Sequence, residues 1–357
     1  MNKHYEVIGI SGEDANLALV RQDEGVRTYG IEMTRTITPI KDLIVVFKLY
    51  KVFKKEKPFI VHTHTPKAGT VGMLASKLAG VPHRLHTIAG LPLLEVKGTK
   101  RKLLDTVEKI TYSCSTKILP NSIGLKNIII ENNYTKPSKL KVIGNGSTNG
   151  IDTDYYDSSL YSESDRGELK EKFNIKNTDL VFIFLGRLVK DKGINELVHA
   201  FNSLSKKHDH CKLFLIGTRE NHLDPLLPST EAIIKENSCI LDAGYKDDVR
   251  PYIAVSNVLA FPSYREGFPN VVLQASCMDL PCIVTDINGC NEIIEHRYNG
   301  LVISPKNEIA LEKAMKFMID NPKQRNTMAK NARPRILKLY RQEFIWKELL
   351  NYYKSLD

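Results

Sequence analysis

The sequence predicts an α/β protein of two doubly wound domains with a cleft between them, and three observations support this fold class. Short apolar segments typical of buried strands alternate with amphipathic segments typical of helices in both halves of the chain. A turn-rich stretch at 145–152 separates the halves. The length of 357 residues is also typical of two domains rather than one. Repeated strand–helix–strand units indicate parallel sheets with helices on both faces.

The first half holds the elements expected of one domain. In chain order we expect strands at 5–10 and 30–33, a helix at 40–55, a strand at 59–62, a helix at 68–79, a strand at 83–88, a helix at 101–115, and strands at 117–120 and 140–143. The helix at 40–55 is apolar at helical spacing and has a lysine-rich face, whereas the helix at 68–79 is built mainly from small residues.

The second half repeats the pattern. We expect strands at 180–185, 212–216, 240–243, 258–261 and 282–285, helices at 195–204 and 271–278, and a helical C-terminal stretch at 324–355. These elements define a first domain at 1–148 and a second at 149–334. The helix at 335–357 is expected to pack back on the first domain.

Charge is distributed unevenly between the halves. Residues 1–150 carry 23 Lys and Arg against 12 Asp and Glu, a net of +11, and residues 151–357 carry 28 against 29, a net of −1. Such a field attracts nucleic acid, an anionic membrane surface or a phosphorylated substrate, unless it is only a solvated surface. Aromatic stacking platforms among the charges are lacking, so we expect no nucleic-acid partner.

The sequence also predicts where the protein acts. No apolar run reaches the roughly 18 to 20 residues that span a bilayer, and no signal-peptide pattern precedes the first strand. The cysteines form no C-x-x-C pair and are expected to be free, mostly buried thiols: Cys114, Cys211, Cys239, Cys277, Cys282 and Cys290. We therefore expect a cytoplasmic protein.

The most informative segment runs from Ser263 to Ala275 and includes Glu266-Gly-Phe-Pro-Asn270. A carboxylate can accept hydrogen bonds from sugar hydroxyls, and the turn exposes backbone N–H groups. The following helix start carries partial positive charge, which suits a phosphate. One short segment could therefore hold both parts of a nucleotide sugar, although a strand, a surface turn and a core helix would give the same pattern.

A second segment, Gly186-Arg-Leu-Val-Lys-Asp-Lys192-Gly, follows the predicted strand at 180–185. Glycine at a strand end lets a ligand approach the backbone. Arg187 offers a planar fork for phosphate oxygens and Lys192 a compact positive charge. Two cations over a diphosphate would stabilise it as a leaving group without a metal. A basic surface loop is the alternative.

Two further strand ends carry polar residues in the first half. His62-Thr-His64-Thr-Pro-Lys67 follows one strand, and His86 lies in the next. His-x-His could ligate a metal, but no cluster of Cys or carboxylates completes a site, so a polar strand end that faces the cleft is the better interpretation. His86 could instead be a hydrogen-bonded histidine of the core.

Together these segments resemble the family 4 retaining glycosyltransferases, which use nucleotide sugars and have the GT-B fold. The resemblance rests on Gly186-Arg187 with Lys192-Gly193, on Leu-x-Ile-Gly217, and on Pro262-Ser-x-x-Glu266-Gly-Phe-Pro. It covers nearly the whole chain. The chain looks most similar to bacterial enzymes that extend lipid-linked saccharides for capsule, O-antigen or protein glycosylation.

The resemblance implies roles for individual residues. Glu266, Arg187 and Lys192 would be catalytic, the two cations holding the donor diphosphate and Glu266 the sugar hydroxyls. The implied donor site consists of Gly186, Arg187, Lys192, Gly217, Glu266, Gly267, Phe268, Pro269, Asn270 and Gln274. The implied acceptor side consists of His64, Lys67 and His86. No metal or other cofactor is expected, because the nucleotide sugar is a substrate.

The chain departs from the family pattern at three places. Gln274 stands where the family usually has a second Glu that binds ribose, and Ala89 stands where many members have a histidine. An amide still hydrogen-bonds a ribose, but more weakly than a carboxylate. The chain also opens at what resembles the family's second strand. Either the true start lies upstream, or the first domain is a shortened form that lacks its N-terminal strand and leaves a sheet edge or a gap.

The expected activity is transfer of a hexose or N-acetylhexosamine from a nucleotide sugar, most simply a UDP-sugar, to a lipid-linked saccharide on a polyprenyl diphosphate. The enzyme would work in bacterial surface polysaccharide synthesis, peripherally on the inner face of the cell membrane. The alternative is a UDP-sugar 2-epimerase of similar fold, which needs no acceptor. The glutamate segment at 263–275 argues against it.

Overall fold

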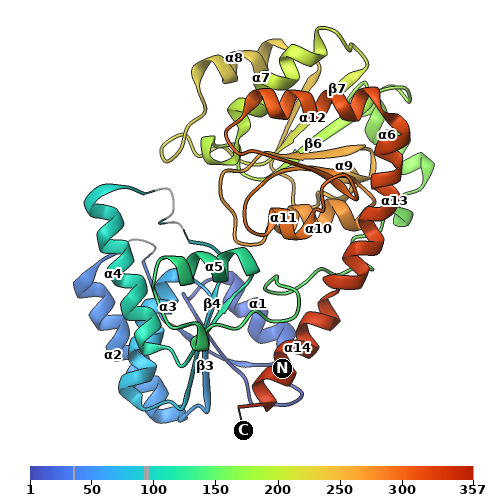
Figure 1. Ribbon diagram of the computed structural model, residues 1–357. Helices are drawn as coiled ribbons and strands as arrows, with labels where there is room; N and C mark the ends of the chain where they lie inside the picture. The colour runs from blue at the N-terminus through green and yellow to red at the C-terminus, as the bar shows by residue number, and fades with distance from the viewer. Residues whose placement is uncertain (35–36, 92, 94–95, 357) are drawn as a thin grey trace. The chain divides into compact units, whose positions relative to one another are not determined.

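The computed structural model describes residues 1–34, 37–91, 93 and 96–356, and it confirms the α/β fold class with parallel sheets in two Rossmann-like units (Figure 1). Unit 1 comprises Met1–Gly144 and Lys347–Asp357, and unit 2 comprises Asn145–Trp346. The sequence analysis placed its boundaries after residues 148 and 334. The chain therefore leaves unit 1 inside the predicted linker and returns to it within the last helix.

The described strands of unit 1 form two separate parallel sheets. β1 (Ile8–Ser11) pairs with β2 (Arg27–Gly30), and a second sheet has the order β3-β4-β5, built from Ile60–Thr63, His83–Ile88 and Lys117–Pro120. Within the part of the chain that the structure describes, no ladder joins β1 or β2 to β3. The described strands of unit 1 are therefore divided between two sheets.

Helices cover these strands. They are α1 (Ala15–Glu24), α2 (Pro39–Glu56), α3 (Pro66–Ala79), α4 (Gly98–Cys114) and α5 (Ile123–Glu131). α3 begins where the Thr65 side chain accepts a hydrogen bond from the N–H of Ala68, and it ends at Gly80, whose φ of 78° is a left-handed cap. α2 packs along α3 through buried Val and Leu side chains, so the small residues of α3 serve close helix packing.

Unit 2 is built on one six-stranded parallel sheet of order β11-β10-β9-β6-β7-β8. Its strands are β6 (Leu180–Leu185), β7 (Cys211–Ile216), β8 (Ile240–Gly244), β9 (Val258–Phe261), β10 (Cys282–Thr285) and β11 (Gly300–Ile303). All six residues of β6 are buried, as expected for a central strand covered on both faces. The order reverses direction between β6 and β9, so the sheet has a topological switch point at their carboxyl ends.

The helices of unit 2 lie on both faces of this sheet. They are α6 (Glu163–Lys172), α7 (Ile194–Ser205), α8 (Pro228–Glu236), α9 (Arg250–Ala254), α10 (Asn270–Cys277), α11 (Cys290–Ile293), α12 (Glu308–Asp320) and α13 (Pro322–Leu339). The last helix, α14 (Gln342–Lys354), begins in unit 2 and ends in unit 1. The switch point of the sheet thus lies between the loops that enter α7 and α10.

Several sequence predictions need correction. The predicted strand at 140–143 is wrong, because only Leu140 forms an isolated bridge, with Ile118. The strand predicted at 30–33 lies instead at Arg27–Gly30. The C-terminal stretch is two helices rather than one, since the chain breaks at Tyr340 and Arg341. The elements α1, α5, α6, α8, α9, α11, β11 and α12 were not predicted as such.

The cysteines and the helix lengths complete the description of the fold. All six cysteines are free, and five of them are buried, with Cys239 at intermediate exposure. None of the described helices combines the length and the apolar character needed to pass through a bilayer.

Candidate active site

The first part of the site is the pair of glycine turns that follow β6 and β7. Gly186 has a φ of 138° and Gly217 a φ of 153°, which side-chain-bearing residues rarely adopt. A Cβ added at Gly217 would lie 1.8 Å from the carbonyl oxygen of Gly186. The backbones of the two turns are therefore in contact. Arg187 follows Gly186 directly, at the carboxyl end of the central strand β6.

The second part is the short 3₁₀ turn Lys190–Lys192, which ends at Gly193. Gly193 has a φ of 72°, and a Cβ there would lie 2.2 Å from the carbonyl oxygen of Pro262. The loop after β6 therefore presses against the end of β9. A glycine at this position is what allows the two strand ends to come so close.

This contact brings Lys192 to Glu266, although they are 74 positions apart in the sequence. The Lys192 Nζ lies 2.5 Å from the Glu266 Oε1, and the two side chains are 16% and 15% exposed. The ammonium keeps donors, and the carboxylate keeps acceptor positions, beyond this one contact. The pair thus offers a positive and a negative group side by side at the switch point of the sheet.

Asn288 and Gly289 hold the backbone after Glu266. The Asn288 Nδ2 donates to the carbonyl oxygen of Glu266, and it lies 3.3 Å from the carbonyl oxygen of Gly267. A Cβ at Gly289 would lie 2.4 Å from the same Gly267 oxygen. The carbonyl groups of this turn are therefore occupied by the loop after β10.

The rest of the turn leads directly into α10. Phe268 is buried and packs edge-on against Tyr340, with ring centroids 5.3 Å apart. α10 begins at exposed Asn270 after Pro269, with no side-chain hydrogen bond capping it. The first N–H groups of a helix lack partners within the helix and attract anions. This helix start follows Glu266 closely in the sequence, so the anion-attracting N–H groups and the ion pair belong to one loop.

Arg187 makes an ion pair of its own. Its Nη1 lies 2.5 Å from the Glu220 Oε2, and the Arg187 side chain is 45% exposed. Because both groups are partly in water, the pair contributes little to stability. A phosphate at the strand ends would have to share Arg187 with Glu220 or replace it. Glu220 had not been identified from the sequence.

Gln274 lies in α10, C-terminal to the loop that carries Glu266, and its hydrogen-bond partner was not predicted from the sequence. Its Nε2 donates to the Tyr156 hydroxyl at 2.8 Å. Burial raises the pKa of Tyr156 above its ordinary value, so the hydroxyl stays protonated at neutral pH. An amide whose nitrogen donates in this way keeps its carbonyl oxygen as an acceptor for another group.

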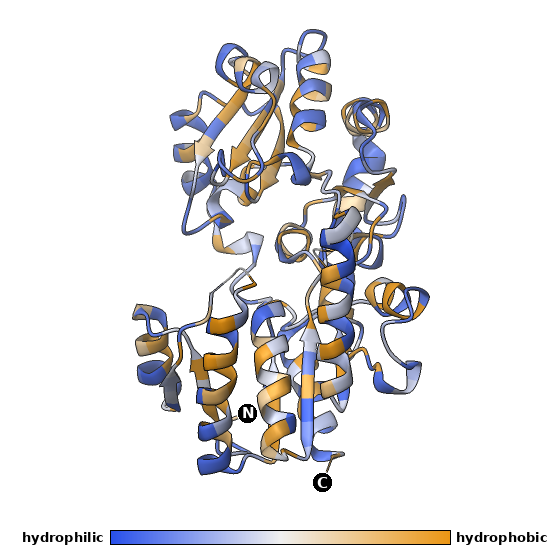
Figure 2. Cartoon of the chain, turned by 90° about the vertical axis from the view of Figure 1, so that its left-hand side faces the viewer, coloured by the Kyte–Doolittle hydropathy of each residue, from blue (hydrophilic) through white to orange (hydrophobic). Residues whose placement is uncertain are grey.

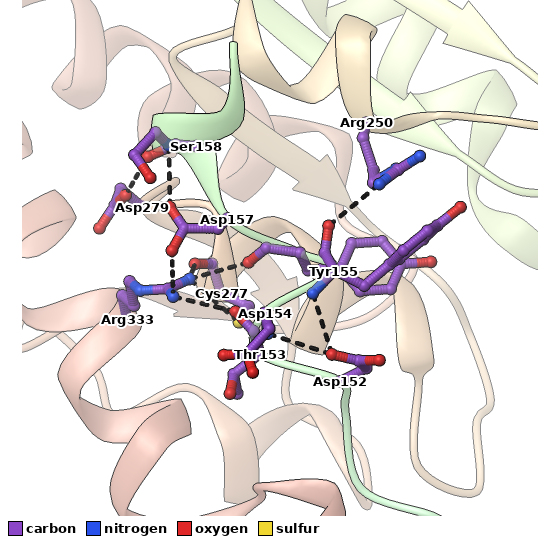
Figure 3. Close-up of polar contacts among 12 residues, drawn as sticks. Asp152, Thr153, Asp154, Tyr155, Asp157, Ser158, Arg250, Cys277, Asp279 and Arg333 are labelled. Atoms are coloured by element: carbon purple, nitrogen blue, oxygen red, sulfur yellow. Dashed lines mark hydrogen bonds and ion pairs between the residues drawn. The ribbon is translucent and has the colours of Figure 1, made fainter.

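Arg333 of α13 fixes the segment that carries Tyr156 (Figure 3). Its guanidinium donates to the carbonyl oxygens of Tyr156, Cys277 and Thr153 at 2.8, 2.6 and 2.9 Å. It also lies 2.7 Å from the Asp157 carboxylate. Burial alone would raise the pKa of Asp157, but hydrogen bonds from Ser159 and the charge of Arg333 outweigh burial and lower it. Through Arg333, the segment 153–157, which follows the predicted linker, is therefore held at the end of α10.

The three acceptor-side candidates lie at the β3 and β4 ends of unit 1, in different environments. His64 is exposed and follows β3 directly. The Lys67 Nζ lies 2.7 Å from both carboxylate oxygens of Asp42 in α2. His86 is buried, its Nδ1 2.8 Å from the Thr63 Oγ1. The structure therefore leaves His64 as the candidate most open to a ligand, and it places His86 in the core.

His62, the other histidine of the His-x-His motif, was not among the acceptor-side candidates, and it makes more contacts than His64. The His62 Nδ1 lies 2.5 Å from the Tyr353 hydroxyl of α14, and its Nε2 lies 2.7 Å from the Thr87 Oγ1. Burial lowers the pKa of His62 well below its ordinary value. In the described residues, no group of three or more His, Cys, Asp and Glu side chains could hold a metal ion. The His-x-His motif thus links α14 to the sheet of unit 1.

Comparison with known proteins identifies the family. A model described as glycosyl transferases group 1 matches residues 165–335, and a glycosyl transferase 4-like domain matches residues 5–146. The capsular polysaccharide biosynthesis glycosyltransferase CapM of Staphylococcus aureus is 32% identical over 356 residues, which is 99% of this chain and 90% of that protein. The chain belongs to the group 1, family 4-like glycosyltransferases. It is a hexosyltransferase.

Other similarities are consistent with this membership. An Escherichia coli enzyme named UDP-Gal:alpha-D-GlcNAc-diphosphoundecaprenol alpha-1,3-galactosyltransferase is 31% identical over 88% of this chain and 80% of its own length. Among solved structures, HepE of Anabaena in complex with UDP-glucose superposes with a TM-score of 0.80 at 19% identity, covering 98% of this chain and 91% of that one. That likeness shows the shared GT-B fold of this glycosyltransferase.

Proposed function

We propose that this hexosyltransferase moves a hexose or N-acetylhexosamine from a UDP-sugar to a saccharide linked to a lipid diphosphate, with retention at the transferred carbon. The observation that carries the proposal is the 2.5 Å contact of Lys192 with Glu266 at the switch point of unit 2, in a loop that also carries Arg187. The names of the Escherichia coli relative and of a 28% identical Campylobacter jejuni relative both describe transfer to diphospho-undecaprenol saccharides, which supports this acceptor class.

In this proposal unit 2 binds the donor. Lys192 and Arg187 hold the diphosphate, with Gly186 and Gly217 leaving room for it at the strand ends. Glu266 accepts hydrogen bonds from the sugar hydroxyls, and the N–H groups of the following turn and of the start of α10 face the phosphates. These assigned contacts draw on the residues Gly267, Phe268, Pro269 and Asn270.

The chemical step then depends on the leaving group. As the bond between the sugar carbon and the diphosphate breaks, negative charge grows on the departing phosphate, and two fixed cations stabilise it. The acceptor hydroxyl attacks on the face that the phosphate leaves and gives its proton to the departing phosphate oxygen, so the configuration is conserved. This scheme requires no metal and no protein nucleophile.

Unit 1 would bind the acceptor, with His64 as its most accessible candidate, and the enzyme would work peripherally on the inner face of the cell membrane. The excess of positive charge in residues 1–150 supports that location, because a lipid diphosphate and anionic headgroups are both negative. Acceptors of this kind lie in a membrane, so the enzyme has to reach the bilayer surface to use them.

Transfer from UDP-, GDP- and TDP-sugars to a synthetic lipid-diphosphate saccharide tests the proposal. We expect transfer from a UDP-sugar, and we expect Arg187→Ala and Glu266→Ala each to lower kcat/KM by about 100-fold or more. Near-normal turnover in both variants would refute the assigned site. The configuration at the transferred carbon, measured by NMR of the product, tests retention.

The same assay without acceptor separates transfer from epimerisation of the free nucleotide sugar. We expect no change in the UDP-sugar under those conditions, because the named relatives are glycosyltransferases. Conversion of the UDP-sugar at a rate similar to that of transfer would favour the epimerase instead.

A further inference from the structure

Helix α2 of unit 1 exposes a strip of apolar side chains that no neighbouring element covers. Its inner face buries Val45, Val46, Leu49 and Phe53 in the core. Its outer face is apolar in the first half of the helix, where Ile40 is 78% exposed, Leu43 65%, Ile44 52% and Phe47 57%. Adjacent Leu78 at the end of α3 is 60% exposed, and with Leu43 and Phe47 it lines a shallow surface groove.

Figure 2 presents the side on which Figure 1 places α2 and α4, and hydrophobic residues lie along the helices that face the viewer there. A single exposed Leu or Ile needs no explanation, but several within the first turns of one helix form a continuous patch. The inner face of α2 already packs against the core of unit 1. Packing within unit 1 therefore does not explain why the outer face is apolar as well.

The second half of the same outer face is cationic. Lys48, Lys51 and Lys54 are exposed, and the structure shows no ion pair for them among the residues that it describes. The Lys51 Nζ lies over the Phe47 ring, 4.5 Å from its centre, so the positive charge adjoins the apolar strip directly.

The acidic residues of α2 do not offset this charge. Both carboxylate oxygens of Asp42 accept hydrogen bonds from Lys67, and Thr38 donates to them as well. Burial alone would raise the pKa of Asp42, but hydrogen bonds from Lys67 and Thr38 outweigh burial and lower it, so the carboxylate stays charged and paired. Glu56 is engaged by Arg27 and Tyr29. The outer face of α2 is thus apolar at one end, positive at the other, and without a negative group of its own.

We propose that the outer face of α2 is the surface through which this enzyme docks on an anionic lipid bilayer. A helix with an apolar strip and flanking lysines lies in the plane of the interface, where its apolar side chains enter the acyl boundary and its amines meet negative headgroups. The proposal extends the proposed function, because it names the element that binds the membrane. It rests on that function only for the reason why the enzyme would need to bind a membrane.

Charge complementarity favours lipid over a second copy of the chain as the occupant. In a two-fold helix pair, the face of one copy meets the same face of the other. The lysines of each α2 would then be placed against the apolar strip or the lysines of its partner, where no carboxylate compensates them. Anionic headgroups compensate the same lysines, and the bilayer interior accepts the apolar strip.

Vesicle co-sedimentation of the full-length protein tests the proposal, with phosphatidylcholine vesicles that contain or lack phosphatidylglycerol. The double variant Leu43→Gln/Phe47→Gln should lower the partition coefficient for anionic vesicles by about tenfold or more. The triple variant Lys48→Gln/Lys51→Gln/Lys54→Gln should lower it by a similar factor at low salt and flatten its salt dependence. Circular dichroism and a melting curve confirm that each variant folds.

Leu160→Gln/Ile309→Gln is the matched control, because both residues are exposed, apolar and in unit 2. It should bind vesicles like the wild type. Failure of the wild type to bind anionic vesicles, or equal loss in this control, would overturn the proposal. So would light scattering that shows a wild-type dimer and a monomeric Leu43→Gln/Phe47→Gln variant, since the strip would then be an interface between copies.

The two hypotheses fail separately. Vesicle binding is measured without any sugar, so it does not depend on the proposed reaction. Conversely, transfer to a short-chain, water-soluble diphosphate acceptor should be unchanged in Leu43→Gln/Phe47→Gln. Vesicle binding without transfer by the wild type to any acceptor would refute the proposed function and leave the docking surface standing.

Discussion

The strand ends of the two units carry polar residues in different states. At the carboxyl ends of the unit 2 strands, charged side chains form ion pairs: Lys192 contacts Glu266, and Arg187, in the same loop as Lys192, contacts Glu220. At the β3 and β4 ends of unit 1, His62 and His86 are hydrogen-bonded to Thr87 and Thr63. Burial keeps both histidines neutral by lowering their pKa values.

The difference shows that a polar residue at a strand end is not enough to make a ligand site. In unit 2, glycines at left-handed or close-contact positions let separate loops converge and keep charged groups near the surface. In unit 1, His86 lies against α3, where a Cβ at Gly69 would come within 2.3 Å of its ring, and His62 is held by Thr87 and Tyr353. We therefore expect substitutions in unit 2 to affect the reaction and those at the buried histidines to affect stability.

The largest effect should come from Lys192→Ala. It removes a cation from the leaving group and leaves Glu266, which is only 15% exposed, without its partner. We expect kcat/KM to fall by about 100- to 1000-fold in steady-state transfer assays. Lys190→Ala is the matched control, because Lys190 is in the same turn and exposed. A comparable loss in Lys190→Ala would mean that the turn, rather than the ion pair, is required.

Gly193→Ala should have the second-largest effect. It tests whether the close contact between the loops after β6 and β9 in unit 2 is required. The added Cβ meets the Pro262 carbonyl oxygen at 2.2 Å, and the φ of 72° disfavours alanine. We expect a loss of about 2–4 kcal/mol in the free energy of unfolding and a fall in kcat/KM. Gly167→Ala in α6 is the control, since nothing lies within 4 Å of its Cβ. Denaturant unfolding should show it stabilised by about 0.5–1 kcal/mol.

Much of this fold could be predicted from the sequence, and the failures have physical reasons. The buried strands β6, β9 and β10 are continuous apolar runs, and the structure gives them the predicted bounds. α6 was missed because none of its residues is buried, so it has no apolar periodicity. Its only strong signal is the capping box of Ser162 and Asp165.

The site shows a similar limit. Lys192 and Glu266 were identified as separate candidates, but their contact depends on how the β6 and β9 loops fold together, which local sequence does not encode. The partners Glu220 and Tyr156 had no motif of their own. Asn288 had one local signal, the dipeptide Asn288-Gly289 in the loop after β10, because Asn-Gly is typical of tight turns.

A smaller effect is expected from the buried histidines of unit 1. Burial lowers the pKa of His86 from its ordinary value of 6.5 to about 4. The folded state therefore binds fewer protons than the unfolded state between these values, and its stability falls as the pH falls. Between about pH 7.5 and about pH 5 we expect a loss of about 1–2 kcal/mol from His86, measured by urea unfolding.

His86→Gln should reduce that pH dependence, because the amide can bond Thr63 but does not titrate. The exposed His222→Gln is the control and should leave the pH dependence as it is in the wild type. Donor KM should be unchanged in His86→Gln, since its place is in unit 1. A large rise in donor KM would contradict the separation of roles between the two sets of strand ends.

The smallest effect, and the finest test of the donor site, is that of Gln274→Glu. In the wild type the Gln274 amide donates to the Tyr156 hydroxyl, and its carbonyl oxygen is the one acceptor that it offers to a ribose. A carboxylate at this position would accept from Tyr156 and still present a charged oxygen, and charge-assisted hydrogen bonds are about twice as strong as neutral ones. We expect the KM for the UDP-sugar to fall about three- to tenfold with kcat nearly unchanged.

Tyr156→Phe is the companion variant to Gln274→Glu, because it removes the hydroxyl that holds the amide. Alone it should raise the KM for the UDP-sugar, since the freed amide can turn its carbonyl oxygen away from the ribose. Combined with Gln274→Glu it should raise KM less, because both oxygens of a carboxylate accept and either can face the ribose. An unchanged KM in Gln274→Glu would show that this position of α10 does not face the ribose.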